Sequence, residues 1–241
     1  EPSGNKNAAL PILAACLLTD EKVILNNVPN IQDVQTMRRL LQSFGVKINC
    51  INEHRWEIQA DDLRPADLDP DISSKIRASI LLAGPMVARL GSINLPPPGG
   101  DIIGRRRVDT HILALEALGA KGEYNRFFSF ESKGLRGADI LLDEASVTAT
   151  ENAIMAAVTA KGKTVIRNAA SEPHVQDLCY FLNTLGAEIS NIGSNMLIIN
   201  GVSKLHGGEY TIGPDYLEVV SFVGAAVVTK GEIRIRNAGI E

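Results

Sequence analysis

The sequence predicts an α/β fold in which one structural unit repeats three times, with apolar helices buried at the centre and sheets outside them. Two observations lead to this fold class. Four segments share one layout: an apolar, alanine-rich stretch, a short charged or glycine turn, and a brief strand pattern. Amphipathic helices that end at glycine separate these segments. The spacing is about 70 residues, longer than the period of common solenoid repeats.

The alanine-rich segments are apolar on every side, which is typical of helices that are buried all round. Their small residues also allow close helix contacts. The segments begin near 7, 77, 151 and 219, and strand patterns follow at 22–27, 92–95, 164–168 and 232–237. The fourth segment starts a unit that the chain does not finish. We therefore expect a three-fold repeat domain over 1–215, with 216–241 starting the connection to a second domain that is absent from this chain.

The second kind of helix has one apolar face. Apolar residues at three- and four-residue spacings, followed by a glycine, predict amphipathic helices over 34–44, 112–118 and 175–185. Such helices cover a surface rather than fill a core. Strand-like residues come directly after each glycine, at 46–48, 121–124 and 187–190.

Composition limits the function classes. Apolar residues make up 45% of the chain and charged residues 22%, as in a globular protein, and the net charge is −4. No basic surplus exists to bind nucleic acid or an anionic membrane. Cys16, Cys50 and Cys179 lack metal-ligand spacing, and Cys16 and Cys179 are expected to be core thiols. Neither a signal peptide nor a membrane-spanning run is visible, so a cytoplasmic location is expected.

The starts of the buried helices are the first candidate site. Lys6 and Asn7 open the first helix, Arg77 opens the second, and 146–150 opens the third. If the units are related by pseudo-symmetry, these starts gather at one end of the domain. Helix N-termini carry partial positive charge and unpaired N–H groups, so added cations there favour a phosphate site. Alternatively, Lys6 and Arg77 are solvated charges and Ser146 is an ordinary N-cap.

The second candidate is the loop 95–109. Prolines stiffen its start, and glycines at 99, 100 and 104 let the backbone bend. Asp101 stands near the tip, and arginines follow at 105–107. We expect a mobile lid that brings an acid and cations to an anionic substrate. The alternative is an exposed turn whose charges face water. His111 is interpreted as a packing or capping residue, and Glu151 and Asp177 as helix-start charges.

Several motifs together resemble one enzyme family. Residues 3–12, 75–79, 98–104, 106–111 and 146–152 are similar, in order, to the motifs of UDP-N-acetylglucosamine 1-carboxyvinyltransferases, also called UDP-N-acetylglucosamine enolpyruvyl transferases. The resemblance covers essentially the whole chain. It implies an inside-out α/β barrel of the enolpyruvyl transferase type. It also implies transfer of the enolpyruvyl group of phosphoenolpyruvate to the 3'-hydroxyl of UDP-N-acetylglucosamine with release of phosphate, the first committed step of peptidoglycan synthesis.

The resemblance also implies residue roles, with no metal and no cofactor. Asp101 would be the catalytic acid. Phosphoenolpyruvate would be bound by Lys6, Asn7 and Arg106, and Asn7 would also contact the sugar. UDP-N-acetylglucosamine would be bound by Arg77, Arg106, Arg107, Val108, Asp109, Thr110, Ser146 and Val147.

The sequence departs from the family pattern at three places. Asp101 replaces the usual loop cysteine, so insensitivity to the epoxide fosfomycin, which alkylates that thiol, is expected. Glu144 replaces a usual lysine, and Arg105 and Arg107 stand where Ala and Pro are common. The second domain of the family supplies the carboxylate that deprotonates the sugar. The isolated chain is therefore expected to bind weakly if at all and not to turn over.

Two other functions stay open. A shikimate 3-phosphate enolpyruvyl transferase would share the fold and the reaction class. A non-catalytic nucleotide-sugar binding domain would keep the barrel without the chemistry, and Glu144 gives that alternative some support. The expected partners are the two substrates and the second domain, with no nucleic acid and no membrane.

Overall fold

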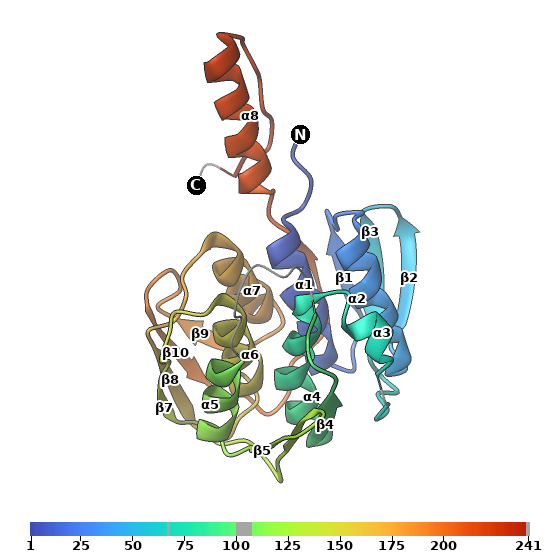
Figure 1. Ribbon diagram of the computed structural model, residues 1–241, viewed down its shortest axis with the longest axis vertical. Coiled ribbons are helices and arrows are strands. Elements are labelled where there is room, and N and C mark those ends of the chain that lie inside the picture. The colour runs from blue at the N-terminus through green and yellow to red at the C-terminus, as the bar shows by residue number, and fades with distance from the viewer. Residues whose placement is uncertain (67, 100–107, 240–241) are drawn as a thin grey trace.

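The computed structural model describes residues 1–66, 68–99 and 108–239, and its helices lie between sheets placed around the molecule (Figure 1). Within these ranges the strands form three sheets. The first sheet has the order β11 (Gly208–Thr211), β1 (Val23–Asn26), β3 (Arg55–Gln59) and β2 (Lys47–Asn52). The second has the order β7 (Asp139–Leu141), β8 (Lys163–Arg167), β10 (Met196–Asn200) and β9 (Glu188–Ser190). The third has the order β4 (Ser92–Leu95), β6 (Phe128–Glu131) and β5 (Lys121–Tyr124).

The three sheets repeat one pairing pattern. Each sheet contains one strand that follows a buried helix (β1, β4 or β8) and one antiparallel hairpin (β2 with β3, β5 with β6, or β9 with β10). The strand after the helix pairs antiparallel with the second strand of that hairpin. A parallel edge strand is added in the first two sheets, where β11 pairs with β1 and β7 pairs with β8. The pairing of β11 with β1 joins the end of the repeat region to its beginning.

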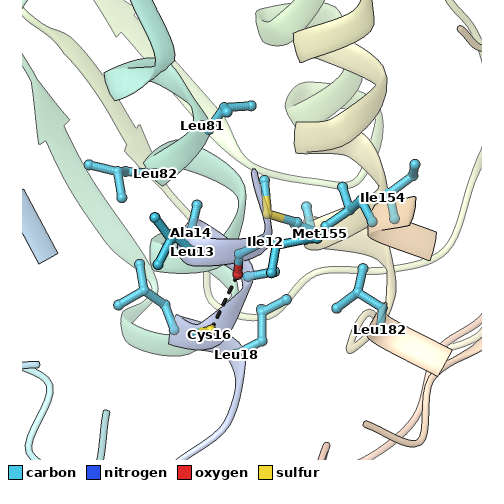
Figure 2. Packing of buried hydrophobic residues seen from close by; sticks show 14 of the residues in the cluster. Ile12, Leu13, Ala14, Cys16, Leu18, Leu81, Leu82, Ile154, Met155 and Leu182 are labelled. Atoms are coloured by element: carbon cyan, nitrogen blue, oxygen red, sulfur yellow. Dashed lines mark hydrogen bonds between the residues drawn. The ribbon is translucent and has the colours of Figure 1, made fainter. Parts of the chain in front are cut away.

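Three helical segments that are buried along their length form the core. They are α1 (Lys6–Ala15) with the 3₁₀ helix η1 (Cys16–Leu18), η2 (Arg77–Leu82) with α4 (Ala83–Leu90), and α6 (Val147–Ala157). Figure 2 shows their side chains packed together: Ile12 and Leu13 from α1, Leu81 and Leu82 from η2, and Ile154 and Met155 from α6. Cys16 is buried here and its thiol donates to the Ile12 carbonyl at 3.3 Å. The expectation of a core thiol is confirmed.

The second buried segment differs from the expected single helix. Its first part is a 3₁₀ helix, and an α-helix begins only at Ala83. Pro85 favours the change, although α1 stays α-helical with Pro11 inside it. In a continuous α-helix the Pro85 nitrogen would face the Leu81 carbonyl, but proline has no N–H to donate and its ring crowds that carbonyl. The segment still fills the predicted central position.

The amphipathic helices form as predicted. They are α2 (Gln32–Ser43), α5 (Asp109–Ala117) and α7 (Pro173–Thr184). Gly45, Gly119 and Gly186 follow them with positive φ, the conformation that favours glycine after a helix. The short helix α3 (Pro70–Ser73) and the strands β3, β6, β7, β10 and β11 were not predicted from the sequence.

One buried polar cluster joins the helices. The side-chain amide of Asn152 donates to the Ile80 carbonyl and contacts His111 Nδ1, both at 2.8 Å, while its Oδ1 accepts from the Gly84 N–H at 2.8 Å. His111 Nε2 lies 3.1 Å from Thr148 Oγ1. His111 is therefore a buried packing residue, as interpreted from the sequence.

The last helix, α8 (Tyr216–Thr229), stands away from the three sheets (Figure 1). None of its described residues is buried, so the expectation of a fourth buried helix is not met here. The strand expected at 232–237 is also not formed, because no described strand lies beside it to pair with. The N-terminal segment lies beside the start of α8. There Gly4 forms an isolated antiparallel β-bridge with Pro214, and the Ser3 N–H donates to the Glu218 carboxylate at 3.0 Å. Among the described helices none is both long and apolar enough to span a bilayer.

Candidate functional site

A pocket of about 490 Å³ opens where the N-terminal ends of α1, η2, α6 and α7 meet. Its position follows from the repeat, because each unit contributes the start of a helix to the same end of the domain. The lining residues are Lys6, Asn7, Leu10, Pro11, Asp33, Lys75, Ile76, Arg77, Ala78, Leu81, Val147, Thr148, Glu151 and His174.

The expectation that the helix starts gather at one place is confirmed, since Lys6, Asn7, Arg77 and Val147 line this single pocket. Lys75 adds a further cation. The pocket is therefore suited to bind an anion through local charge although the net charge of the chain is negative.

The cation of the first helix has a carboxylate partner. Lys6 Nζ lies 3.1 Å from Asp33 Oδ2, and both side chains are more than a third exposed. An exposed pair of this kind is weak, about 0–1 kcal/mol. An anionic ligand can therefore compete with Asp33 for Lys6.

The helix starts are capped by their own side chains. Asn5 Oδ1 accepts from the N–H groups of Asn7 at 2.8 Å and Ala8 at 3.1 Å. Ser146 Oγ accepts from the Ala149 N–H at 3.4 Å. Ser146 is thus an N-cap in this structure, and its neighbour Val147 is the residue that lines the pocket.

The predicted catalytic acid Asp101, with Arg105, Arg106 and Arg107, lies outside the described residues. The two flanks of that loop are described. A Cβ on Gly99 would lie 1.5 Å from the Ser74 carbonyl oxygen, so only glycine fits where the chain passes this backbone. The loop therefore starts beside residues 74–77, which lead into the pocket.

The loop returns at the start of α5. Val108 is half-buried and Asp109 exposed, while Thr110 is buried and its hydroxyl donates to Asp143 Oδ1 at 2.6 Å. The 3.1 Å contact between His111 and Thr148 lies one residue further along α5. The predicted nucleotide-binding segments 108–110 and 146–147 are thus brought next to each other.

Several pocket residues had not been recognised from the sequence as site residues, and two of them are titratable groups near the starts of α6 and α7. Glu151 was interpreted as a helix-start charge, but it is only 1% exposed. Burial, with the nearby Glu172 charge, raises the pKa of its carboxyl well above the usual value. The available signal was a glutamate inside an otherwise apolar helix. The other residue is His174, at the start of α7.

His174 connects the pocket to α8. Its Nδ1 lies 3.0 Å from the Tyr216 hydroxyl, and the two rings stack nearly parallel with centroids 6.2 Å apart. Burial lowers the pKa of His174, while the charges of Glu172 and Asp215 oppose that shift. Tyr216 is the first residue of α8.

Asp177 is also not a solvated helix-start charge. Its carboxylate accepts hydrogen bonds from the Tyr210 hydroxyl and from the Gly213 N–H. Asp177 therefore connects α7 to the segment that precedes α8. Burial raises the pKa of Asp177, and these two hydrogen bonds act in the opposite direction.

His111 is held neutral behind the pocket. Burial, and to a smaller extent the Arg77 charge, lowers the pKa of His111 to about 3. No cluster of three or more His, Cys, Asp or Glu side chains with metal-site spacing occurs within the described part of the chain.

The fold is that of one domain of the enolpyruvyl transferases. The structure superposes on the enolpyruvyl transferase NikO from Streptomyces tendae with a TM-score of 0.81 at 21% identity, over 93% of this chain and 54% of that one. It superposes on EPSP synthase from Acinetobacter baumannii with a TM-score of 0.78 at 17% identity, over 100% of this chain and 56% of that one. At such identities the likeness concerns the fold alone.

The chain belongs to the EPSP synthase (3-phosphoshikimate 1-carboxyvinyltransferase) family, whose sequence profile matches residues 1–241. It is a homologue of UDP-N-acetylglucosamine 1-carboxyvinyltransferases. Identity is 55% over 235 residues with that of Treponema denticola and 56% over 241 residues with that of Bradyrhizobium diazoefficiens. The match covers 98% and 100% of this chain, and 55% and 56% of those proteins. The chain thus spans about half the length of these relatives.

Proposed function

We propose that this chain forms the substrate-loop half of a UDP-N-acetylglucosamine 1-carboxyvinyltransferase of peptidoglycan synthesis. The complete enzyme transfers the enolpyruvyl group of phosphoenolpyruvate to the 3'-hydroxyl of UDP-N-acetylglucosamine and releases phosphate. The observation that carries the proposal is the pocket in which Lys6, Lys75 and Arg77 meet at the starts of the buried helices. The 55% identity to a curated relative of that activity supports it.

The proposed residue roles follow the family likeness. Lys6 and Asn7, with Arg106, bind phosphoenolpyruvate. UDP-N-acetylglucosamine is bound by Arg77, Arg106, Arg107, Val108, Asp109, Thr110, Ser146 and Val147. The contact between Thr110 and Asp143 supports the nucleotide assignment, because it brings the start of α5 next to the loop before α6.

Asp101 is proposed as the catalytic acid. The addition step needs a proton on C3 of the enol while the sugar oxygen attacks C2, and elimination of phosphate then restores the vinyl group. An ordinary aspartate has a pKa near 3.9, so an acid active near pH 7 needs a shift of about three units, or about 4 kcal/mol. Desolvation and the substrate phosphate would raise this pKa, whereas the arginines at 105–107 would lower it. Asp101→Asn in a complete enzyme tests the role.

We also propose that residues 1–215 form one inside-out α/β barrel and that 216–241 lead into a second barrel domain. The repeated pairing pattern of the three sheets supports the first part. The second part is supported by the exposed apolar side chains of α8, which include Leu217, Phe222 and Val223. A helix with this surface needs a covering partner in solution.

Calorimetric titration of the chain with UDP-N-acetylglucosamine and, separately, with shikimate 3-phosphate tests the substrate assignment. We expect weak but measurable binding of the nucleotide sugar, at millimolar ligand if needed, and none of shikimate 3-phosphate. Arg77→Ala should weaken the binding of the nucleotide sugar at least tenfold, because roughly one charge-assisted hydrogen bond is lost. The reverse preference would overturn the proposal in favour of the shikimate enzyme.

Turnover is tested in a chimera. Residues 1–241 replace the matching half of the Treponema denticola relative, and phosphate release is measured with both substrates. Activity comparable to that relative supports catalysis. A chimera that binds the nucleotide sugar but releases no phosphate would instead favour a non-catalytic nucleotide-sugar binding domain.

A further inference from the structure

Glu151 differs from the other charged residues of the pocket because almost none of its surface is exposed. It occupies the second turn of α6 and is 1% exposed, whereas the wall beside it carries the cations Lys6, Lys75 and Arg77. Its Oε1 atom is fully buried and has no hydrogen-bond partner among the described residues. A buried polar atom without a partner costs about 1–3 kcal/mol. The open space that Glu151 borders is the pocket itself.

The surroundings of Glu151 favour a protonated carboxyl. Burial and the charge of Glu172 both raise its pKa. Titratable or charged groups face this region from five helices. They are Lys6 from α1, Asp33 from α2, Lys75 and Arg77 from η2 and its approach, His111 from α5, and Glu172, His174 and Cys179 at and in α7.

A protonated carboxyl has one O–H donor, whereas a carboxylate only accepts. In a pocket whose cations attract an anion, a carboxylate would repel the ligand and offset the cations. A neutral acid avoids that repulsion and adds a donor. A bound anion also stabilises the protonated form, since a negative charge nearby raises the pKa of a carboxyl.

We propose that Glu151 is a further ligand-binding residue of this pocket, which keeps its proton and donates it in a hydrogen bond to an anionic oxygen of the bound ligand. The ligand class is a phosphate or diphosphate ester. The inference rests on the proposed function only for the choice of UDP-N-acetylglucosamine as a probe. Its buried, unpartnered oxygen and its place among the cations are independent of that choice.

The protonated form binds, so affinity should fall as pH rises through the raised pKa of Glu151. UDP-N-acetylglucosamine suits this test because its diphosphate diester keeps a constant charge and its uracil ring stays neutral between pH 6 and pH 8. A phosphate monoester titrates near pH 6 and would add its own pH dependence.

The experiment is calorimetric titration of the chain with UDP-N-acetylglucosamine from pH 6 to pH 8. Glu151→Gln retains a neutral donor, so we expect affinity within about twofold of the wild type at pH 6 and no decline with pH. Glu151→Ala should bind about tenfold more weakly at pH 6, the loss of one hydrogen bond. Glu123→Gln, an exposed change outside the pocket, should match the wild type. The proposal is overturned if the affinity of Glu151→Gln changes with pH in the same way as that of the wild type. It is also overturned if Glu151→Ala binds as tightly as the wild type at pH 6.

A second measurement does not depend on the affinity of any variant. In protein labelled with ¹³C at the glutamate carboxyls, the Glu151 resonance, assigned by its loss in Glu151→Gln, should have the shift of a protonated acid at pH 7. It should also move when inorganic phosphate is added. An ionised resonance at pH 7, or one that phosphate leaves unchanged, contradicts the inference.

The two measurements separate this inference from the proposed function. If phosphate moves the Glu151 resonance while the nucleotide sugar does not bind, the substrate assignment fails and the role of Glu151 stands. If the nucleotide sugar binds equally well to the wild type and to Glu151→Ala at pH 6, the role of Glu151 fails and the substrate assignment stands.

Discussion

The backbone N–H of Gly84 in α4 donates a 2.8 Å hydrogen bond to the side-chain Oδ1 of Asn152 in α6. The same position explains the glycine, because a Cβ on residue 84 would lie 2.6 Å from the Asn152 carbonyl oxygen. The two buried helices therefore approach at backbone distance and are held there by a side-chain amide. The first two predictions concern this contact.

Asn152→Ala should lower the free energy of unfolding by about 2–4 kcal/mol. The change removes the partners of the Gly84 N–H and the Ile80 carbonyl, both buried, and each unpaired group costs about 1–3 kcal/mol. Urea unfolding followed by circular dichroism measures the effect. Asn49→Ala, on the exposed strand β2, is the control and should change stability by less than about 0.5 kcal/mol. Equal stability of the two variants would contradict the role of Asn152.

Gly84→Ala should destabilise the protein by about 1–3 kcal/mol, because α4 and α6 must move apart to admit the methyl group. Gly224→Ala is a matched control, since Gly224 also lies inside an α-helix but has no atom within 4 Å of its added Cβ. Alanine is the better helix former, so the control should be neutral or stabilising by up to about 1 kcal/mol. Thermal melts of both variants measure these changes in stability, and an equal effect of the two substitutions would contradict the prediction.

His111 should make the protein less stable in acid. Its pKa is about 3 in the folded chain and near 6.5 in the unfolded chain, so between these values the unfolded state binds more protons. Stability therefore falls as pH drops from about 6.5 towards 3, by up to about 1.4 kcal/mol per pH unit. His111→Gln should reduce that slope, and the exposed His206→Gln should not. Urea unfolding at several pH values gives the slopes, and parallel slopes for all three proteins would disprove the assignment.

Asp33→Asn should strengthen the binding of UDP-N-acetylglucosamine severalfold at low ionic strength. The change releases Lys6 from its 3.1 Å ion pair and leaves the pocket more positive. The gain should shrink in 0.5 M salt, because exposed charges are screened. Glu57→Gln breaks a comparable exposed pair with Lys22, outside the pocket, and should leave affinity unchanged. The same gain in both variants would point to a general charge effect.

Fosfomycin should add no mass to the chain at residue 101, because a carboxylate is a much poorer nucleophile towards the epoxide than a thiolate. Iodoacetamide serves as the positive control and should modify Cys50 first, since Cys50 is exposed while Cys16 and Cys179 are buried. Burial also raises the pKa of Cys179 to about 12, which suppresses its thiolate. Intact-mass measurement with peptide mapping reads both reactions. A fosfomycin adduct on Asp101 would be the opposite result.

Much of the fold follows from local pattern. The positions of α2, α5 and α7 could be predicted because apolar spacing and a terminal glycine lie within a few residues of one another. The hairpin strands β3 and β10 were missed although each has five residues and buries alternate side chains, a local pattern that the sequence does contain. The strand β11 depends on a partner far away in the sequence, since Gly208 pairs with Val23. Neither periodicity nor composition reports such a pairing.

The sequence by itself determined the repeat, the family likeness and the common end at which Lys6, Asn7, Arg77 and Val147 meet, since equivalent positions of a repeated unit are brought to equivalent places. Only the tertiary structure decided that Glu151 is buried and that Asp177 is a half-buried acceptor of two hydrogen bonds, rather than both being solvated charges. It also decided that α8 stands apart from the core. The physical reason is that burial depends on what the rest of the chain packs against a residue. A helical pattern is the same whether its apolar side is covered or open to water.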